Sequence, residues 1–221
     1  GTRGEELDPI GTDGFRVLAV GDSFTLGLQV EEHLTFSAQL SDRMSEAMNQ
    51  KVTVINAGVP GYTSYQILRR MRRELKSLTP DVVLLTCANN DFWRWDNRTD
   101  AEQSKRLTRS PLRDSLMHSR AFQLASEWYG QSGSQVPDQD AEWARKASLN
   151  YFEPEDTWTP RVPLEDFESN LLQIASLCEE QKVPLILVIW PDQLQAAGKW
   201  SVRASYHDAM FKVASERGLL I

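Results

Sequence analysis

Short apolar runs alternate with segments of helical periodicity along most of this chain. Runs that fit buried strands, bounded by glycine, proline or polar residues, lie at 15–20, 51–55, 82–87 and 185–190. A fifth run starts at Gly218 and reaches Ile221, as expected for the beginning of another strand. Apolar residues that recur every three or four positions predict helices at 34–48, 63–78, 165–181 and 201–216. In the helix at 63–78, the arginines at 69, 70, 72 and 73 are expected mostly on a solvated face opposite the apolar one.

Strands separated by crossover helices predict a parallel sheet that is covered on both faces. We therefore expect the α/β class, with a three-layer α/β/α sandwich and a mostly parallel, flavodoxin-like sheet. The alternation breaks at about 92–163, where the apolar spacing predicts a helix at 111–130. We interpret 92–163 as an insertion, either a lid or a packed decoration, within a single domain of residues 1–221.

Composition narrows the classes of function. The 221 residues include 24 Lys and Arg against 31 Asp and Glu, a net charge of −7, which argues against a nucleic-acid partner. A hydrophobic fraction of 41% is ordinary for a globular protein. Cys87 and Cys178 are expected as buried free thiols. Three scattered histidines and two cysteines provide no ligand cluster, so neither a metal nor a cofactor is expected.

The first candidate site loop follows the first predicted strand. In Gly21–Gly27, Ser23 stands at a strand-to-helix turn, where a helix N-terminus favours developing negative charge. A helix-capping serine is the alternative interpretation. The sequence is neither a G-x-S-x-G elbow nor a Walker loop. A flavodoxin-like nucleotide-binding function is therefore disfavoured, because the chain has no phosphate loop for it.

Two further loops follow the second and third predicted strands. Gly61, in the loop after Asn56, allows a tight turn that exposes a backbone N–H, although a plain turn is an alternative. In Ala88–Asp91, the amide of Asn90 could donate a hydrogen bond to an oxyanion, although such residues are also ordinary in loops. Carboxyl ends of parallel strands share one edge of a sheet, so we expect Ser23, Gly61 and Asn90 to converge.

This ordered set of loops resembles the SGNH (GDSL-type) serine hydrolases. Gly21–Phe24 matches the first family block, G-D-S-x, and Ala88–Asp91 matches the third block, G-x-N-D, with alanine in place of glycine. The resemblance is close over 15–91 and implies a nucleophile at Ser23. It also implies an oxyanion hole formed by the N–H groups of Ser23 and Gly61 with the side chain of Asn90.

Several residues depart from the family pattern or receive no catalytic role. The change to Ala88 is expected to be mild and to stiffen its loop. The fourth family block, D-x-x-H, is absent, so we expect the base histidine and its aspartate beyond Ile221. The remaining polar residues are expected in surface, packing or structural roles: His33, His118 and His207 on or between helices, and Asp22 and Asp91 bonded to loop N–H groups.

The resemblance implies a serine ester hydrolase that acts on a small-molecule or polysaccharide ester. Trp93 and Trp95 follow Asn90, and their aromatic faces suit sugar rings or acyl chains, so an O-acetyl group on a glycan is a candidate substrate. Packing of these aromatic residues is the alternative. An acyltransferase of the same fold, or a glycan- or lipid-binding module without a base, also stays open. The start of the chain is similar to secreted or membrane-anchored bacterial members, which favours an extracytoplasmic location with any anchor outside this chain.

Overall fold

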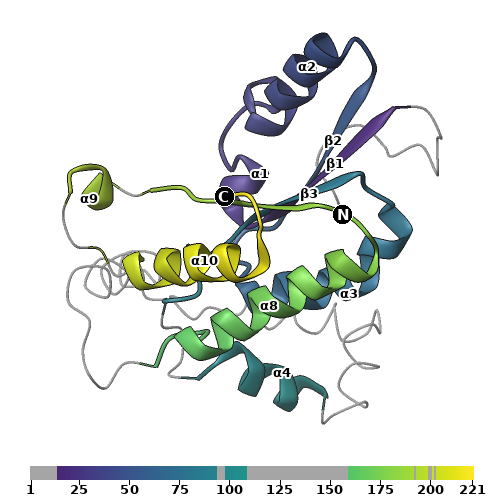
Figure 1. The fold of residues 1–221 in the computed structure, drawn as a ribbon. Helices are drawn as coiled ribbons and strands as arrows, with labels where there is room; N and C mark the ends of the chain where they lie inside the picture. Colours follow the sequence, from purple (N-terminus) through teal and green to yellow (C-terminus); the bar gives the residue numbers. More distant parts are fainter. Residues whose placement is uncertain (1–13, 94–97, 109–158, 192, 199–200, 202) are drawn as a thin grey trace, which may run out of the picture.

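A parallel sheet forms the centre of the molecule in the computed structural model. The structure describes residues 14–93, 98–108, 159–191, 193–198, 201 and 203–221. The strands are β1 (Phe15–Gly21), β2 (Val52–Gly58), β3 (Val82–Thr86) and β4 (Leu185–Val188), in the spatial order β2-β1-β3-β4 (Figure 1). Leu220 adds a parallel bridge beside Ile186, and its carbonyl accepts from the N–H of Leu187 at 2.9 Å. The predicted parallel α/β architecture is confirmed. The terminal run at 218–221 lies beside β4, where a fifth strand of the sheet would begin.

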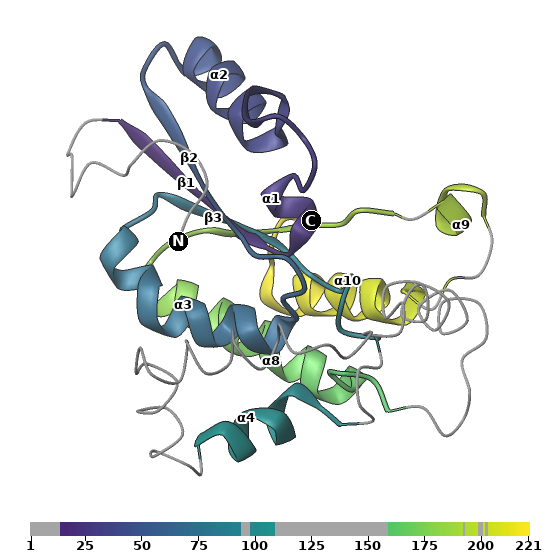
Figure 2. The same cartoon turned by 180° about the vertical axis from the view of Figure 1, so that it is seen from behind.

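Helices cover both faces of this sheet. They are α1 (Ser23–Leu26), α2 (Phe36–Met48), α3 (Ser64–Leu78), α4 (Asp100–Thr108), α8 (Leu164–Glu180), α9 (Gln193–Ala196) and α10 (Ala204–Arg217). A short 3₁₀ helix, Glu32–Leu34, precedes α2. Figures 1 and 2 show α2 on one face of the sheet and α3, α8 and α10 on the other, with α4 outside α3 and α8. The three predicted layers are therefore present.

The burial of the central strand β1 explains why it is apolar from Val17 to Val20. Successive residues of a strand point to opposite faces. Leu18 and Val20 enter the large core shared with α3, α8 and α10, whereas Val17 lies in the smaller core beneath α2. Both faces of β1 are thus buried over Val17–Val20, which accounts for the apolar run there.

The element boundaries differ from the predictions where tertiary pairing extends or shortens a strand. β2 continues to Gly58, three residues past the predicted end, because its register with β1 runs as far as Gly21 opposite Gly58. β4 already ends at Val188. α4 had no counterpart among the predicted helices, and the helix predicted at 111–130 lies outside the described residues. The single-domain interpretation and the insertion stay predictions.

Arg70 corrects one feature of the predicted arginine face of α3. Its predicted position is on a solvated helix face, but the residue is only 6% exposed. Its Nη1 donates to the carbonyl of Ala57 at 2.8 Å, and its Nε pairs with Glu74 at 2.6 Å. Because the Ala57 carbonyl at the end of β2 accepts this hydrogen bond, the Arg70 guanidinium can lie buried between α3 and the sheet.

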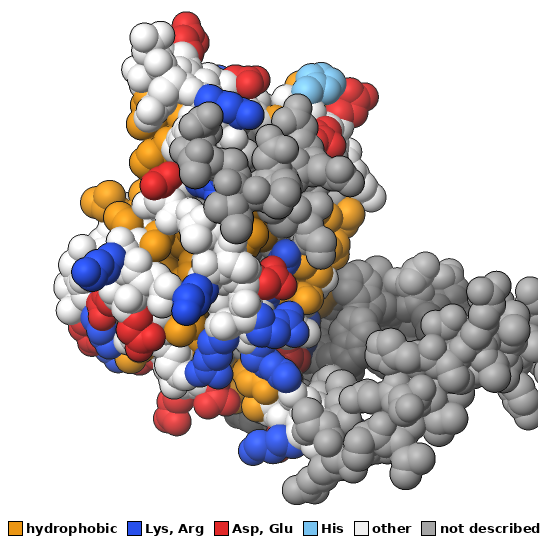
Figure 3. Space-filling model, turned by 90° about the vertical axis from the view of Figure 1, so that its right-hand side faces the viewer, with side chains coloured by type: hydrophobic (Ala, Val, Ile, Leu, Met, Phe, Trp, Pro, Cys, Tyr) orange, Lys and Arg blue, Asp and Glu red, His pale blue; other side chains and the backbone are white. Residues whose placement is uncertain are grey.

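The described residues bear on the cysteines, on membrane spans, on metal binding and on the charge of the surface. Cys87 and Cys178 are buried and free, as predicted. Among the described helices, none has the length and apolar character needed to cross a membrane. The described part of the chain holds no group of three or more His, Cys, Asp or Glu side chains arranged for a metal ion. On the face drawn in Figure 3, basic and acidic side chains lie beside one another.

Candidate active site

Ser23 opens helix α1 directly after the central strand. The carboxylate of Asp22 caps this turn, because its Oδ1 accepts from the N–H of Phe24 at 2.9 Å. The first N–H groups of a helix have no partner within the helix and concentrate partial positive charge there. Ser23 is half-buried. The nucleophile candidate therefore lies at a strand-to-helix turn, as the sequence predicted.

The end of β2 packs tightly against this turn. A Cβ at Gly58 would stand 2.2 Å from the backbone nitrogen of Leu26, so only glycine fits there. The side chain of Asn56 adds a polar link, donating to the carbonyl of Thr25 at 2.9 Å and accepting from the N–H of Gly58 at 3.1 Å. These contacts fix the second loop against the first.

Gly61 presents an exposed stretch of backbone in the second loop. Its φ is +76°, in the left-handed region that favours glycine, and no heavy atom lies within 4 Å of the place a Cβ would occupy. The N–H of Tyr62 donates to the carbonyl of Val59 at 3.2 Å and closes the turn. The backbone at Gly61 is therefore open to a ligand.

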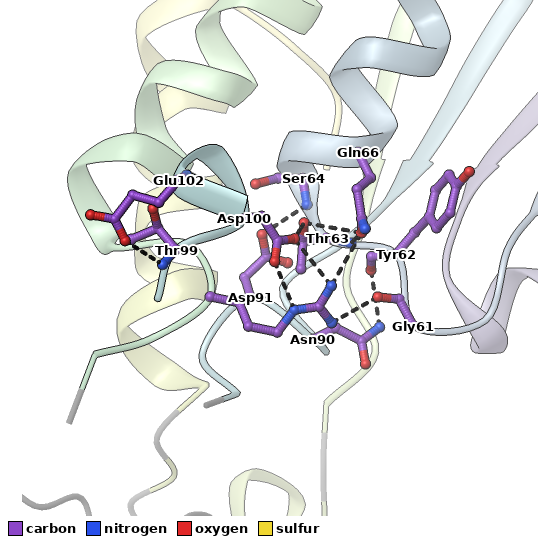
Figure 4. A network of polar contacts seen from close by, with 11 residues as sticks. Gly61, Tyr62, Thr63, Ser64, Gln66, Asn90, Asp91, Thr99, Asp100 and Glu102 are labelled. Atoms are coloured by element: carbon purple, nitrogen blue, oxygen red, sulfur yellow. Dashed lines mark hydrogen bonds and ion pairs between the residues drawn. The ribbon is translucent and has the colours of Figure 1, made fainter. Parts of the chain in front are cut away.

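Asn90 connects the three loops. Its Nδ2 donates to the carbonyl of Tyr62 at 3.0 Å and to Oδ2 of Asp22 at 3.3 Å (Figure 4 shows Asn90 beside the Gly61–Tyr62 backbone). The structure therefore brings together the loops of Ser23, Gly61 and Asn90. In this arrangement both amide hydrogens of Asn90 are engaged within the protein.

Two buried carboxylates hold these loops, in the structural role expected from the sequence. Asp91 accepts from the N–H groups of Ser64 at 2.8 Å and Ala88 at 3.1 Å. Burial raises the pKa of Asp91 to about 6, although these hydrogen bonds and the Arg161 charge oppose the rise. Burial also raises the pKa of Asp22, against the opposing effects of Asn89, the Phe24 N–H and the Arg203 charge.

Ala88 differs from the expectation of a mild replacement. It is fully buried, and its φ is +80°, a value that costs a residue with a Cβ about 1–2 kcal/mol. The family glycine would adopt this conformation freely. The substitution therefore places backbone strain two residues before Asn90, which is more than a stiffening of the loop.

The histidines considered as alternative bases occupy different environments. His207 on α10 is 4% exposed, and its Nδ1 lies 2.9 Å from Nε2 of Gln195. His33 is exposed, and its Nδ1 lies 3.7 Å from the Glu31 carboxylate. His118 lies outside the described residues. His33 thus has the predicted surface position, whereas His207 is part of the interior.

Of the two candidate substrate-binding tryptophans, the structure describes Trp93. Trp93 is half-buried and packs against the large core, with its ring centroid 6.1 Å from that of Phe92. Trp95 lies outside the described residues. The packing alternative therefore has direct support at Trp93.

Arg161 and Asp100 lie beside the second loop, although nothing in the sequence predicts a role for either. They form an ion pair at 3.0 Å, and Arg161 also donates to the carbonyl of Gly61. Their separation along the chain left no local motif to indicate this pairing. The signal available in the sequence was a charged residue between prolines, in Pro160–Pro163, ahead of a helix.

Comparison with known proteins completes the description of the site. The model of the GDSL-like Lipase/Acylhydrolase family matches residues 19–220. An arylesterase of Vibrio mimicus is 36% identical over 79 residues, which cover 36% of this chain and 39% of that protein. Thioesterase 1/protease 1/lysophospholipase L1 of Escherichia coli (strain K12) is 32% identical over 90 residues, 41% of each chain. Both matches thus span about two-fifths of the relative's length. The crystal structure of AlinE4, an SGNH-hydrolase family esterase, shares the fold with a TM-score of 0.55 at 15% identity, over 94% of this chain and 75% of that one.

Proposed function

The chain belongs to the GDSL-like lipase/acylhydrolase family, and from this premise we propose that it is a serine ester hydrolase with its nucleophile at Ser23. The observation that carries the proposal is the position of Asn90. Its amide bridges the Ser23 loop and the Gly61 loop through Asp22 and Tyr62. A site for acyl transfer requires a nucleophile and several oxyanion donors at one place, and this bridge gathers the candidate groups there.

In the proposed reaction, Ser23 Oγ attacks the ester carbonyl and a histidine base takes its proton. The carbonyl oxygen becomes an oxyanion that accepts from the N–H groups of Ser23 and Gly61 and from the Asn90 amide. Collapse of this intermediate expels the alcohol, which takes a proton from the histidine, and leaves an acyl group on Ser23. Water then attacks the acyl-enzyme by the same route and releases the carboxylic acid.

The present bonds of Asn90 indicate how it would enter this reaction. Its bond to the Tyr62 carbonyl is 3.0 Å long, whereas the bond to Asp22 is 3.3 Å long. The bond to Asp22 has the less favourable length, and the hydrogen it uses is the one we expect an oxyanion to take over. The Tyr62 bond would meanwhile keep the amide oriented.

The base is proposed to lie in residues that follow Ile221. Leu220 bridges to Ile186 in parallel, so the chain beyond it leads toward the edge of the sheet that carries Ser23. A histidine and an aspartate from that segment would complete the triad of the resembling hydrolases. His207, buried in α10 beside Gln195, is the alternative within this chain.

Exposed apolar side chains in the segment that follows Ser23 support an ester with an apolar part. Phe24, Leu28 and Leu34 are 48%, 54% and 53% exposed, and all three follow Ser23 closely in the sequence. Because Trp93 packs against the core, the described residues add nothing to the case for a glycan, and the O-acetyl-glycan substrate stays a prediction. Acyl transfer to another acceptor and binding without catalysis remain the alternatives to hydrolysis.

The proposal is tested by turnover of p-nitrophenyl acetate. We would assay the 221-residue chain, the same chain with any residues that its gene encodes after Ile221, and Ser23→Ala of each. Turnover that is lost in the Ser23 variant supports the proposal. Equal rates with and without Ser23 in every form would show that serine ester hydrolysis is wrong. Activity of the 221-residue chain that is lost in His207→Gln would instead place the base on α10.

A further inference from the structure

A short backbone segment ahead of α8 is joined to the loop that carries Asn90. The N–H of Arg161 donates to the carbonyl of Trp93 at 2.8 Å, and the N–H of Val162 donates to that of Asp91 at 3.0 Å. The carbonyl of Arg161 in turn accepts from the N–H of Asp100 at 2.8 Å. The backbone on both sides of the Arg161 side chain is therefore fixed beside the candidate active site.

The Arg161 guanidinium divides its donors between a carboxylate and the second site loop. Nε and Nη2 donate to Oδ1 and Oδ2 of Asp100 at 3.0 and 3.1 Å. Nη1 donates to the carbonyl of Gly61 at 2.8 Å. The two side chains are only 12% and 5% exposed. This fork geometry is specific to arginine, because a lysine ammonium cannot span a carboxylate and a separate carbonyl in the same way.

The same cluster holds the other end of the loop, where α3 begins. Thr63 Oγ1 donates to Oδ2 of Asp100 at 2.6 Å, and the N–H of Thr63 donates to Oε1 of Gln66 at 2.9 Å. Arg161 Nη2 lies 3.3 Å from that same Gln66 oxygen. Figure 4 shows Gly61, Tyr62 and Thr63 wrapped around this network at the start of the helix.

We propose that Arg161, paired with Asp100, is a positioning residue that holds the backbone at Gly61 for oxyanion binding. This inference rests on the proposed hydrolase function. Gly61 is exposed and lies at positive φ with open space around it, and glycine has the widest backbone freedom of any residue. Oxyanion donors are effective when their direction is set before the reaction. The bond from Nη1 to the Gly61 carbonyl fixes the peptide unit that follows Gly61, which limits rotation about its φ and ψ and so the direction of its N–H.

The ion pair alone would not require this arrangement. Buried ion pairs contribute little net stability, because desolvation offsets most of the attraction between the charges. The bidentate contact with Asp100 uses Nε and Nη2, yet Nη1 is directed to the Gly61 carbonyl. The cluster is therefore better explained by the geometry that it imposes on residues 61–63 than by the stability that it adds.

The test uses Arg161→Lys, which keeps the positive charge and loses the fork. Arg217→Lys is the matched control, since Arg217 also forms an ion pair, 3.2 Å from Glu179 on the surface. Two quantities are measured in the form of the protein that shows turnover. One is amide hydrogen exchange at Tyr62 and Thr63, whose N–H groups donate to the Val59 carbonyl and to Gln66 Oε1. The other is kcat with KM for p-nitrophenyl acetate. If Arg161→Lys does not fold, Asp100→Asn takes its place, because it keeps the shape of the pair and removes its charge.

The expected result is faster exchange at Tyr62 and Thr63 by about tenfold or more, with exchange in the sheet unchanged. We expect kcat to fall by about 10- to 100-fold with KM within about twofold, as for a misplaced transition-state donor. The control should change neither quantity. Unchanged exchange, unchanged kcat, or a loss confined to KM overturns the inference. If the unmodified protein shows no turnover that depends on Ser23, the hydrolase proposal itself fails, and the inference falls with it.

Discussion

The Nδ2 of Asn90 lies 3.3 Å from Oδ2 of Asp22, and this contact joins the loop after β3 to the loop that carries Ser23. Asp22 is completely buried, and the same side chain caps the turn at Ser23 through the N–H of Phe24. One carboxylate thus orients both the nucleophile turn and the candidate oxyanion amide. Any movement of Asn90 toward a substrate is opposed by its attraction to Asp22.

Replacing Asn90 tests the oxyanion role. In Asn90→Ala the amide donor is lost, and we expect kcat for p-nitrophenyl acetate to fall by about 100- to 1,000-fold with little change in KM. The reason is that this donor contributes chiefly once negative charge has developed on the carbonyl oxygen. Gln173→Ala is a suitable control, because its amide also donates to a backbone carbonyl, that of Ser169 on α8. An effect on KM alone would contradict the role.

The raised pKa of Asp91 predicts a pH-dependent contribution to stability. Its pKa is about 6 in the folded protein against 3.8 in the unfolded chain, so between these values the folded state binds more protons. This contribution therefore favours folding at low pH and is lost as the pH rises through 6. Relative to Asp91→Asn, the wild type should gain about 2 kcal/mol of unfolding free energy at pH 4.5 compared with pH 7.5. Urea unfolding at both pH values measures this, and a difference that is independent of pH would contradict it.

Two glycines near the site should respond differently to a methyl group. Gly58→Ala forces a Cβ to within 2.2 Å of the Leu26 nitrogen, so we expect a loss of about 3 kcal/mol or more of unfolding free energy. Gly61→Ala meets no atom within 4 Å and should lose only about 1–2 kcal/mol, from its positive φ. Thermal and denaturant unfolding of the two variants gives the comparison. A larger loss at Gly61 would show that its loop is packed more tightly than the structure has it.

The fold and much of the site could be predicted from local sequence. The apolar runs identified the strands because both faces of β1 and β3 are buried, as Leu18 and Val17 show on opposite sides of one strand. Ser23 and Asn90 could be located because each follows directly after such a run, and Gly61 because it follows closely. Parallel strands place those points at one edge of the sheet without any further information.

The supporting contacts could not be predicted, because they depend on distant parts of the chain. Arg161 lies 100 residues from Gly61 in sequence, yet its Nη1 lies 2.8 Å from the Gly61 carbonyl. No periodicity or motif predicts such a pairing. It forms only when the segment before α8 binds the loop after β3 in the folded chain. Arg70 was misplaced for the same reason, as its partner is a carbonyl at the end of another element.

The positive φ of Ala88 could not be predicted from the sequence either. A matched pair of variants measures the strain that it causes. Ala88 and Ala57 are both buried, at 0% and 2% exposure, but only Ala88 has positive φ, at +80°. Each change to glycine removes a buried methyl and adds freedom to the unfolded chain. These two costs are nearly the same in both variants, so they cancel when the variants are compared. Ala88→Gly alone relieves left-handed strain. We therefore expect it to lose about 1–2 kcal/mol less unfolding free energy than Ala57→Gly. Equal losses in urea unfolding would mean that the conformation of Ala88 carries no strain, and that the departure from the family glycine is as mild as the sequence suggested.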